Sequence, residues 1–150
     1  MSDRSDISDL LVRYATALDT RDWDLLDSCF TEDAVVDYGR LGGRREGWAA
    51  IRSAVAFIAG FDRTQHLLSN FVITIDADEA QSSSYVHGQH VIGREVLTVG
   101  GVYRDRIVRT PAGWRIAHRS LDPVWQTGNS VLAAIAAARS GAQAPGGRAR

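Results

Sequence analysis

The sequence predicts an α+β fold: a cone-shaped barrel made of a strongly curved antiparallel sheet with helices packed across its concave face. Two observations support this prediction. Roughly the first sixty residues carry helical apolar patterns with one short strand pair, and four long strand-like segments joined by short turns follow. Helices gathered on one face of such a sheet enclose an interior, which is a common place for a ligand pocket.

The first element is an amphipathic helix, expected over residues 5–18 with Ser5 as its N-cap. Apolar residues recur there at helical spacing, and Tyr14 lies on the apolar face. Asp19 follows one turn after Ala15, at the helix end where a negative charge opposes the dipole. The simplest interpretation is a solvated carboxylate, unless another group uses the charge.

A second helix is expected over residues 23–30, with Asp22 as N-cap and with Trp23 and Phe30 facing the core. A short strand follows and places Tyr38 on its core-facing side. A glycine-rich hairpin loop leads from it to a short return strand and a third helix. The first strand and the third helix are expected over residues 34–38 and 48–58.

Four long strands fill most of the second half, where apolar and β-branched residues dominate. We expect the third to bend at Gly100 and Gly101, because glycines inside a strand mark bulges. We expect the fourth to end at Asp122 and Pro123, and an alanine-rich helix to follow over residues 130–139. The four strands are expected over residues 67–75, 79–92, 95–109 and 114–121.

The composition is that of a single soluble domain, expected over residues 1–140, followed by a disordered tail over residues 141–150. The net charge of −1 indicates no strong attraction to nucleic acid or to anionic membranes, so neither is an expected partner. No apolar run reaches membrane-spanning length, and the polar N-terminus lacks the apolar region of a signal peptide. We therefore expect a cytoplasmic location.

The cysteine and lysine counts limit the possible chemistry. The single Cys29 excludes an internal disulfide and argues against a cysteine-based zinc site. All seventeen cationic side chains are arginines, which excludes Schiff-base chemistry and the lysine that anchors pyridoxal phosphate. A Walker-type phosphate loop would also lack its lysine. We therefore expect no cofactor.

His66 stands at the start of the first long strand and is its most informative polar residue. Side chains alternate between the faces of a strand, so Leu68, Asn70 and Val72 are expected on the same face as His66. Both faces carry apolar residues, which predicts cover on both sides. A buried histidine needs a partner. A backbone partner would make His66 structural, whereas a carboxylate would make it a base near neutral pH, and both interpretations stay open here.

No compact set of metal ligands is visible in the sequence, and we expect no metal. His87 and His90 are three residues apart in a predicted strand and therefore point to opposite faces. Neither H-E-x-x-H nor G-x-S-x-G is present, which argues against a zinc protease site and a serine triad. His118 shares a predicted face with Trp114 and Ile116, and we interpret it as a histidine packed near the sheet.

Several segments resemble SnoaL-like proteins of the nuclear-transport-factor-2-like superfamily. Residues 13–24 and 30–34 are similar to the opening of these proteins, and residues 64–66 and 113–116 fit the same pattern. The resemblance covers residues 7–125 and implies the cone-shaped fold predicted above. It does not select one reaction, because this fold hosts many functions, including dehydratases, isomerases, cyclases and proteins without enzymatic activity.

Within this superfamily, the scytalone dehydratases have the most similar pattern. That resemblance implies that Asp19 orients His66, which acts as general base or acid, and that Tyr38 polarises a substrate oxygen. It also implies that His90 is a second catalytic histidine. Tyr14 instead matches a helix tyrosine of the bile-acid dehydratases, five residues before the aspartate.

Leu18, Gly101 and Tyr103 depart from the scytalone dehydratase pattern, so the substrate is not expected to be scytalone. We expect the wall that binds the substrate to come from Asn70, Trp23, Phe30, Tyr103 and Leu68.

These observations favour a cofactor-independent lyase, a dehydratase that acts on a small cyclic or polyketide-like alcohol. An isomerase or polyketide-type cyclase using the same base is the first alternative, and a non-enzymatic small-molecule binding protein is the second. An intact contact between Asp19 and His66 in a closed pocket would favour the enzymes, whereas a pocket filled by side chains would favour the binding protein. We also expect a homo-oligomer, a dimer or trimer, because the C-terminal helix and the long strands need cover.

Overall fold

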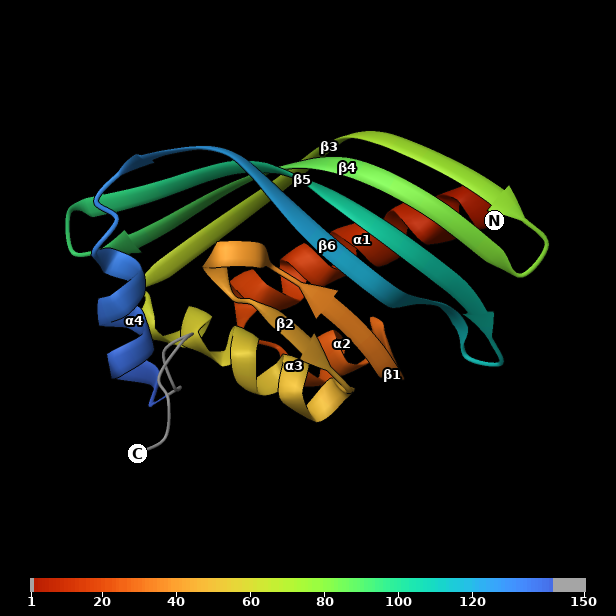
Figure 1. Ribbon diagram of the computed structural model, residues 1–150, viewed down its shortest axis with the longest axis horizontal. Coiled ribbons are helices and arrows are strands. Elements are labelled where there is room, and N and C mark those ends of the chain that lie inside the picture. The colour runs from red at the N-terminus through yellow and green to blue at the C-terminus, as the bar shows by residue number, and fades with distance from the viewer. Residues whose placement is uncertain (1, 142–150) are drawn as a thin grey trace.

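One six-stranded sheet, in the order β2-β1-β6-β5-β4-β3, arches over helix α1 (Figure 1). The computed structural model describes residues 2–141. The strands are β1 (Phe30–Asp37), β2 (Arg44–Glu46), β3 (Arg63–Asp76), β4 (Glu79–Ile92), β5 (Glu95–Thr110) and β6 (Gly113–Gly128). The helices are α1 (Asp3–Thr20), α2 (Trp23–Asp27), α3 (Trp48–Val55), α4 (Leu132–Ser140) and the 3-10 helices η1 (Gly39–Leu41) and η2 (Ala56–Gly60). This arrangement confirms the predicted α+β fold with a strongly curved sheet, which stays open at its edges.

Helix α1 begins earlier than expected because Ser2, not Ser5, caps it. The Ser2 side chain accepts a hydrogen bond from the backbone N–H of Ser5. Asp3 in the first turn accepts two hydrogen bonds from Arg109 of β5, each 2.9 Å long, and one of 3.1 Å from Trp114 Nε1 of β6. These bonds tie the start of the helix to the end of the sheet that lies away from α4.

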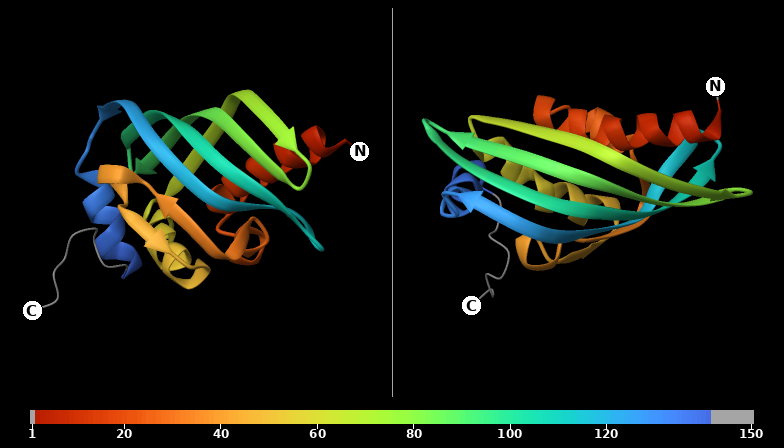
Figure 2. Two further views of the ribbon diagram at one scale, coloured as in Figure 1. Left: turned by 45° about the vertical axis from the view of Figure 1, so that its right-hand side comes forward. Right: turned by 90° about the horizontal axis from the view of Figure 1, so that it is seen from above.

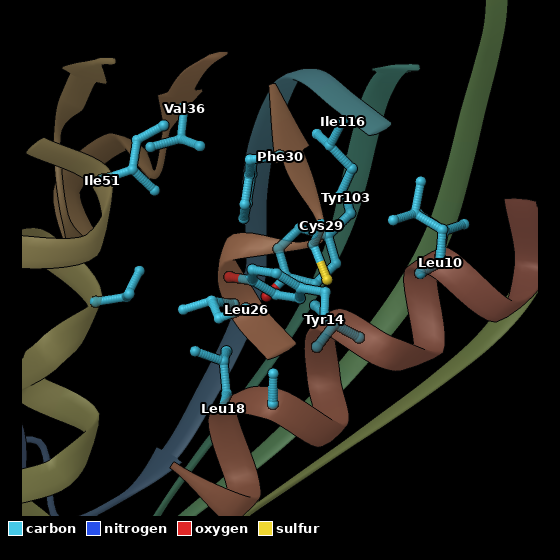
Figure 3. Packing of buried hydrophobic residues seen from close by; sticks show 14 of the residues in the cluster. Leu10, Tyr14, Leu18, Leu26, Cys29, Phe30, Val36, Ile51, Tyr103 and Ile116 are labelled. Carbon is cyan, nitrogen blue, oxygen red and sulfur yellow. The ribbon is translucent and has the colours of Figure 1, made fainter. Parts of the chain in front are cut away.

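The core lies between the concave face of the sheet and the helices (Figure 3). Leu10, Tyr14 and Leu18 point inward from successive turns of α1, as the helical spacing predicts. Ile51 and Val55 of α3 enter the same core from the opposite side, and both are buried. The apolar faces of the helices and the concave face of the sheet therefore form one continuous core.

Two bulges change which side chains face the core, and both contradict the predicted alternation. In β3 the register shifts between Ser69 and Val72, and Asn70 adopts a left-handed backbone with φ 55°. Asn70 and Val72 are consequently exposed, whereas Ile73 is buried.

In β6 an extra residue at Ala117 shifts the pairing between Ile116 and His118. His118 therefore does not share the face of Trp114 and Ile116, and Arg119 faces the core instead.

Several predicted element ends are also wrong. The second helix stops at Asp27, because Phe30 already pairs with Ile116 and starts β1, which runs parallel to β6. Strand β6 does not end at Pro123 but continues to Gly128. Pro123 is tolerated because it lies at a register shift, where Val124 of β6 is the extra residue opposite Gly100 and Gly101.

Helix α4 covers one end of the cone and packs on η2. A side chain at Gly60 would place its Cβ 1.9 Å from the Ala136 carbonyl oxygen, so the two backbones touch directly. Leu132 and Ala136 are buried in this contact, and Arg139 forms an ion pair with Asp62. The tail was predicted over residues 141–150, and all of it except Gly141 lies outside the described residues.

The convex face of the four long strands carries no described helix (Figure 2). Leu67 is 56% exposed and Val72 62% exposed, so the expected cover on both sides of β3 is wrong for the single chain. Among residues 2–141, no helix is long and apolar enough to cross a membrane.

Candidate functional site

Asp19 and His66 are in direct contact inside the cone. His66 Nδ1 lies 2.7 Å from Asp19 Oδ1, and the His66 backbone N–H donates to Oδ2 at 2.8 Å. Thr64 donates a third hydrogen bond to Oδ1 at 2.9 Å. The side chains of His66 and Asp19 are only 8% and 22% exposed. The last residues of α1 and the first residues of β3 thus build one connected polar cluster.

The charge of Asp19 determines which nitrogen of the His66 ring donates a hydrogen bond. Burial raises the pKa of Asp19, but the hydrogen bonds from the His66 side chain and backbone and from Thr64 outweigh it, so the pKa lies below its usual value. The carboxylate is therefore ionised near neutral pH and can only accept hydrogen bonds. His66 must donate through Nδ1–H, which leaves a lone pair on Nε2 when the ring is neutral.

Arg21 explains how an acidic residue is tolerated at the end of α1. Arg21 caps the helix in a left-handed conformation with φ 56°. Its guanidinium donates to the backbone carbonyls of Asp19, Ile58 and Phe61 at 2.8, 3.3 and 2.9 Å. A cation at this end of the helix compensates the dipole, and it also fastens η2 beside the cluster.

His90 stands next to His66 on the concave face of β4. The two ring centroids are 5.1 Å apart with the planes nearly perpendicular, and the ring centroid of Phe61 lies 4.9 Å from that of His90. Burial, followed by the neighbouring His66, lowers the pKa of His90 to about 4. The ring is therefore neutral near pH 7, and Nδ1–H donates to the Leu97 carbonyl at 3.2 Å. Its Nε2 also carries a lone pair.

Three tyrosines form a second polar group of the core. The hydroxyls of Tyr14 and Tyr38 share a hydrogen bond of 2.8 Å, and the rings of Tyr14 and Tyr103 meet edge to face at 5.9 Å. Burial, as the largest cause, raises the pKa of all three hydroxyls well above the usual value. They are therefore neutral at physiological pH and can donate hydrogen bonds.

The sequence prediction missed a buried ion pair beneath these tyrosines. Arg119 donates to both oxygens of Asp105 at 2.7 and 2.9 Å, and both side chains are fully buried. The Arg119 guanidinium lies 4.2 Å from the ring centre of Tyr14 and 4.0 Å from that of Tyr103. Its Nη1 has no hydrogen-bond partner among the described residues.

A signal for this pair was present but incomplete. Asp105 lies between Tyr103 and Ile107 on a face that is otherwise apolar, and an acidic residue in that position needs a cation. The bulge at Ala117 hid its partner, because simple alternation places Arg119 on the outer face.

The remaining predicted residues lie in different places. Phe30 is buried and stacks on Trp48 at 5.3 Å, while Trp23 and Leu68 are half-buried beside the core. Asn70 is exposed at the bulge of β3 and does not join the other candidates. The structure thus brings Asp19 together with both histidines, and Tyr14 together with the other two tyrosines.

Two hollows of about 410 and 540 Å³ lie against the outer side of the sheet, and neither is lined by Asp19, His66 or His90. The smaller one is lined mostly by outward-facing residues but also by Asp105 of the buried ion pair. The larger is lined by Leu67, Tyr85, His87, Trp125 and their neighbours. Because the polar clusters lie on the inner face, we place the candidate site there and treat the outer hollows as surface features. Among residues 2–141, no three His, Cys, Asp or Glu side chains gather as a metal-binding group.

Comparison with known proteins agrees with this fold. The uncharacterized protein Rv2910c of Mycobacterium tuberculosis is 40% identical over 123 residues, which cover 79% of this chain and 84% of the relative. Terrestric acid biosynthesis cluster protein E of Penicillium crustosum is 36% identical over 140 residues, covering 86% and 88%.

Two solved structures from Novosphingobium aromaticivorans are also similar. A protein named as a candidate aromatic ring hydroxylase is 34% identical with a TM-score of 0.79, covering 87% of this chain and 96% of its own. A protein named as a candidate scytalone dehydratase is 26% identical with a TM-score of 0.79, covering 98% and 95%. Residues 1–120 match the family described as the SnoaL-like domain. This match over most of the sequence confirms the resemblance, and the chain belongs to the SnoaL-like family.

Proposed function

We propose that the protein is a cofactor-independent dehydratase whose base is the His66–Asp19 dyad. The observation that supports this most strongly is the 2.7 Å contact between His66 Nδ1 and Asp19 Oδ1, which leaves Nε2 of the imidazole as an acceptor. A histidine held by a carboxylate in this way is suited to move protons near neutral pH. The similarity to a structure named as a candidate scytalone dehydratase supports the same reaction class.

Elimination of water needs one group to take a proton from carbon and one to protonate the leaving hydroxyl. In the proposed reaction His66 Nε2 takes the proton, the electron pair of the C–H bond forms the new double bond, and the C–O bond breaks. The imidazolium, stabilised by Asp19, then gives its proton to the departing hydroxide, which leaves as water. Proton and charge balance without any further reactant.

The tyrosines and His90 would supply the other interactions. Tyr14 and Tyr38 are neutral hydroxyls joined by one hydrogen bond, so the one that accepts in this bond would donate its own proton to an oxygen on which negative charge develops. His90 is neutral near pH 7 and would accept a hydrogen bond from a substrate hydroxyl beside His66. The half-buried apolar side chains around the core, among them Trp23, Leu68 and Phe71, favour a small cyclic or polyketide-like alcohol as substrate.

An isomerase or cyclase is the second candidate, because the same base and the same hydroxyls also serve reactions in which no water leaves. The relative from a biosynthesis cluster supports action on a small organic metabolite without choosing between these reactions. A non-enzymatic binding protein is the third candidate. It would use the same inner face but would not depend on the acceptor at His66 Nε2.

A substrate screen tests the proposal. Small cyclic and polyketide-like alcohols are incubated with the protein, and loss of water is scored by mass spectrometry and by absorbance of the new double bond. We expect turnover by the wild type and by Asp24→Asn, a control at an exposed aspartate in the first turn of α2. We expect none by His66→Ala. Rearranged product of unchanged mass would select the isomerase or cyclase, and binding that is equal in all three proteins would select the binding protein.

We also propose a homo-oligomer, a dimer or trimer, in the cytoplasm. The support is the open outer face, where Leu67, Tyr85 and Trp125 are 56%, 55% and 45% exposed. The C-terminal helix does not need this cover, since Leu132 and Ala136 already pack inside the chain. Light scattering at micromolar protein should give a multiple of the chain mass, and a monomeric mass would contradict the proposal.

A further inference from the structure

Gly88 lies on the concave face of β4 at the point where the two histidine rings meet. It pairs with His66 across the sheet and precedes His90 by two residues, so all three share one face. A Cβ at this position would lie 3.1 Å from His66 Cδ2, 3.3 Å from His66 Nε2 and 3.2 Å from His90 Cε1. The two imidazole rings therefore lie against the volume that the Cβ of any other residue would fill.

The backbone at Gly88 does not explain the glycine. Gly93 and Gly113 have φ values of 61° and 102°, which L-residues rarely adopt, and each lies at a turn between long strands. Gly88 is absent from the positive-φ residues and sits in regular pairing with both neighbouring strands. A side chain is therefore excluded at Gly88 by crowding and not by the backbone conformation, because the two imidazole rings lie where it would go.

Both rings are held by contacts of their own. The ring centroid of Phe61 lies 4.9 Å from that of His90, His90 donates a hydrogen bond to Leu97, and only 8% of His90 is exposed. His66 is held by Asp19, whose two oxygens are fixed in turn by Thr64 and by the His66 backbone.

A contact of 3.1–3.3 Å is tighter than a methyl group normally accepts, so one ring must move by a few tenths of an ångström. A shift of the His66 ring would disturb the alignment of its 2.7 Å hydrogen bond to Asp19.

We propose that Gly88 is a positioning residue for the His66–Asp19 dyad. The missing side chain lets the His66 ring reach Asp19 while His90 stands beside it. The kinetic part of this inference rests on the proposed function. The geometric part concerns only the orientation of the imidazole and is independent of any reaction.

The test is NMR of protein labelled with ¹⁵N in its histidine rings, which reports the tautomer of His66 and the exchange of its Nδ1 proton. In the wild type we expect the Nδ1–H tautomer and a slowly exchanging proton. In Gly88→Ala we expect faster exchange and a mixture of tautomers. Gln89→Ala, the neighbouring residue on the outer face, is the matched control and should keep the wild-type signals. A Gly88→Ala protein with wild-type His66 signals would overturn the inference.

A double variant tests the cause. Because the added methyl lies between two rings, removing one ring should make room for it, so Gly88→Ala should affect the His66 signals less in a His90→Ala background. An equal effect in both backgrounds would contradict the proposed crowding. If Gly88→Ala alone does not fold, the His66 signals of His90→Ala are compared with those of the double variant. The two sets of signals should be alike, because removing the His90 ring makes room for the added methyl group.

The kinetic readout separates this inference from the proposed function. With a substrate from the screen, Gly88→Ala should lower kcat by about 10- to 100-fold, because small misplacements of a reacting group have effects of this size. KM should change less than kcat, since the acceptor is displaced while the apolar wall is intact. Disturbed NMR signals with unchanged kcat would show that the dyad is not the base and would remove the proposed function. Undisturbed signals with unchanged kcat would remove only the role of Gly88.

Discussion

Strands β5 and β6 carry two arginine–aspartate pairs, one on each face of the sheet. On the inner face Arg119 and Asp105 are fully buried and joined by two hydrogen bonds, with the rings of Tyr14 and Tyr103 against the guanidinium. On the outer face Arg104 and Asp122 meet at 3.0 Å and are 63% and 59% exposed.

The difference between these pairs shows what the interior of the cone demands. An ion pair at the surface changes the free energy of unfolding by little, because water already solvates both charges. A buried charge costs several kcal/mol of stability unless its partner is placed correctly. The inner face nevertheless holds an ion pair, two histidines, a carboxylate and three tyrosines, each with a partner. Such a concentration of partnered polar groups in a core is typical of functional sites, although ion pairs that only support the structure also occur.

The largest expected effect concerns the dyad, which exists on the inner face alone. Asp19→Asn should lower turnover by about 10²–10⁴-fold, because it removes the negative charge that stabilises the imidazolium and replaces one acceptor oxygen by a donor. The double variant with His66→Ala should be little worse than the more damaged single variant, as expected for residues that act as one unit. Steady-state rates of the three variants check this, and additive losses would contradict it.

The second prediction compares the two ion pairs directly. Arg119→Met leaves Asp105 buried without its cation and should lower the free energy of unfolding by about 3–5 kcal/mol. Arg104→Met on the outer face should change it by less than about 1 kcal/mol. Urea unfolding at neutral pH measures both values. Equal losses of unfolding free energy at the two positions would show that the buried ion pair is no more important for stability than the exposed one.

The third prediction uses His90, whose pKa is lowered to about 4 from the ordinary 6.5. Because the unfolded chain binds this proton more readily, the contribution to stability is complete above pH 6.5 and is lost as the pH falls toward 4. Between pH 7 and pH 5 the loss should be about 2 kcal/mol.

His90→Phe should remove this part of the pH dependence, with His87→Phe on the outer face as the control for the exchange of a histidine for phenylalanine. Unfolding curves at the two pH values measure the difference. An identical pH dependence in His90→Phe and the wild type would show that His90 is not the titrating group.

The smallest expected effect is that of metal removal. Proton transfer by the dyad needs no metal, and the sequence offers no compact ligand set, so exhaustive chelation should leave the rate unchanged. Loss of activity that one divalent cation restores would contradict the metal-free reaction.

The comparison of the two faces also explains how far the sequence could be interpreted. The fold class and most elements follow from periodicity, because helical and strand patterns are long and separate along the chain. The strand residues could be assigned to the inner or outer face only as far as the first bulge. One extra residue at Asn70 or Ala117 reverses the alternation of the side chains, and the hydrophobic pattern of the strand does not reveal where this happens.

The candidate site was predictable in part for the same reason. Asp19 stood out as an acidic residue at the wrong end of a helix, and the family resemblance linked it to His66. Spacing alone could not join them, since 47 residues separate the two. Arg119 was missed because of the bulge before it, and Asn70 was placed in the site because the bulge beside it was not anticipated.

The proposed reaction requires that Asp19 holds His66 as the Nδ1–H tautomer, because only then can Nε2 act as the base. The ¹⁵N chemical shifts of the His66 ring, compared between the wild type and Asp19→Asn, measure this without any substrate. We expect a proton on Nδ1 in the wild type and a mixture of tautomers in Asp19→Asn. A proton on Nε2 in the wild type, or the same tautomer in both proteins, would contradict the account.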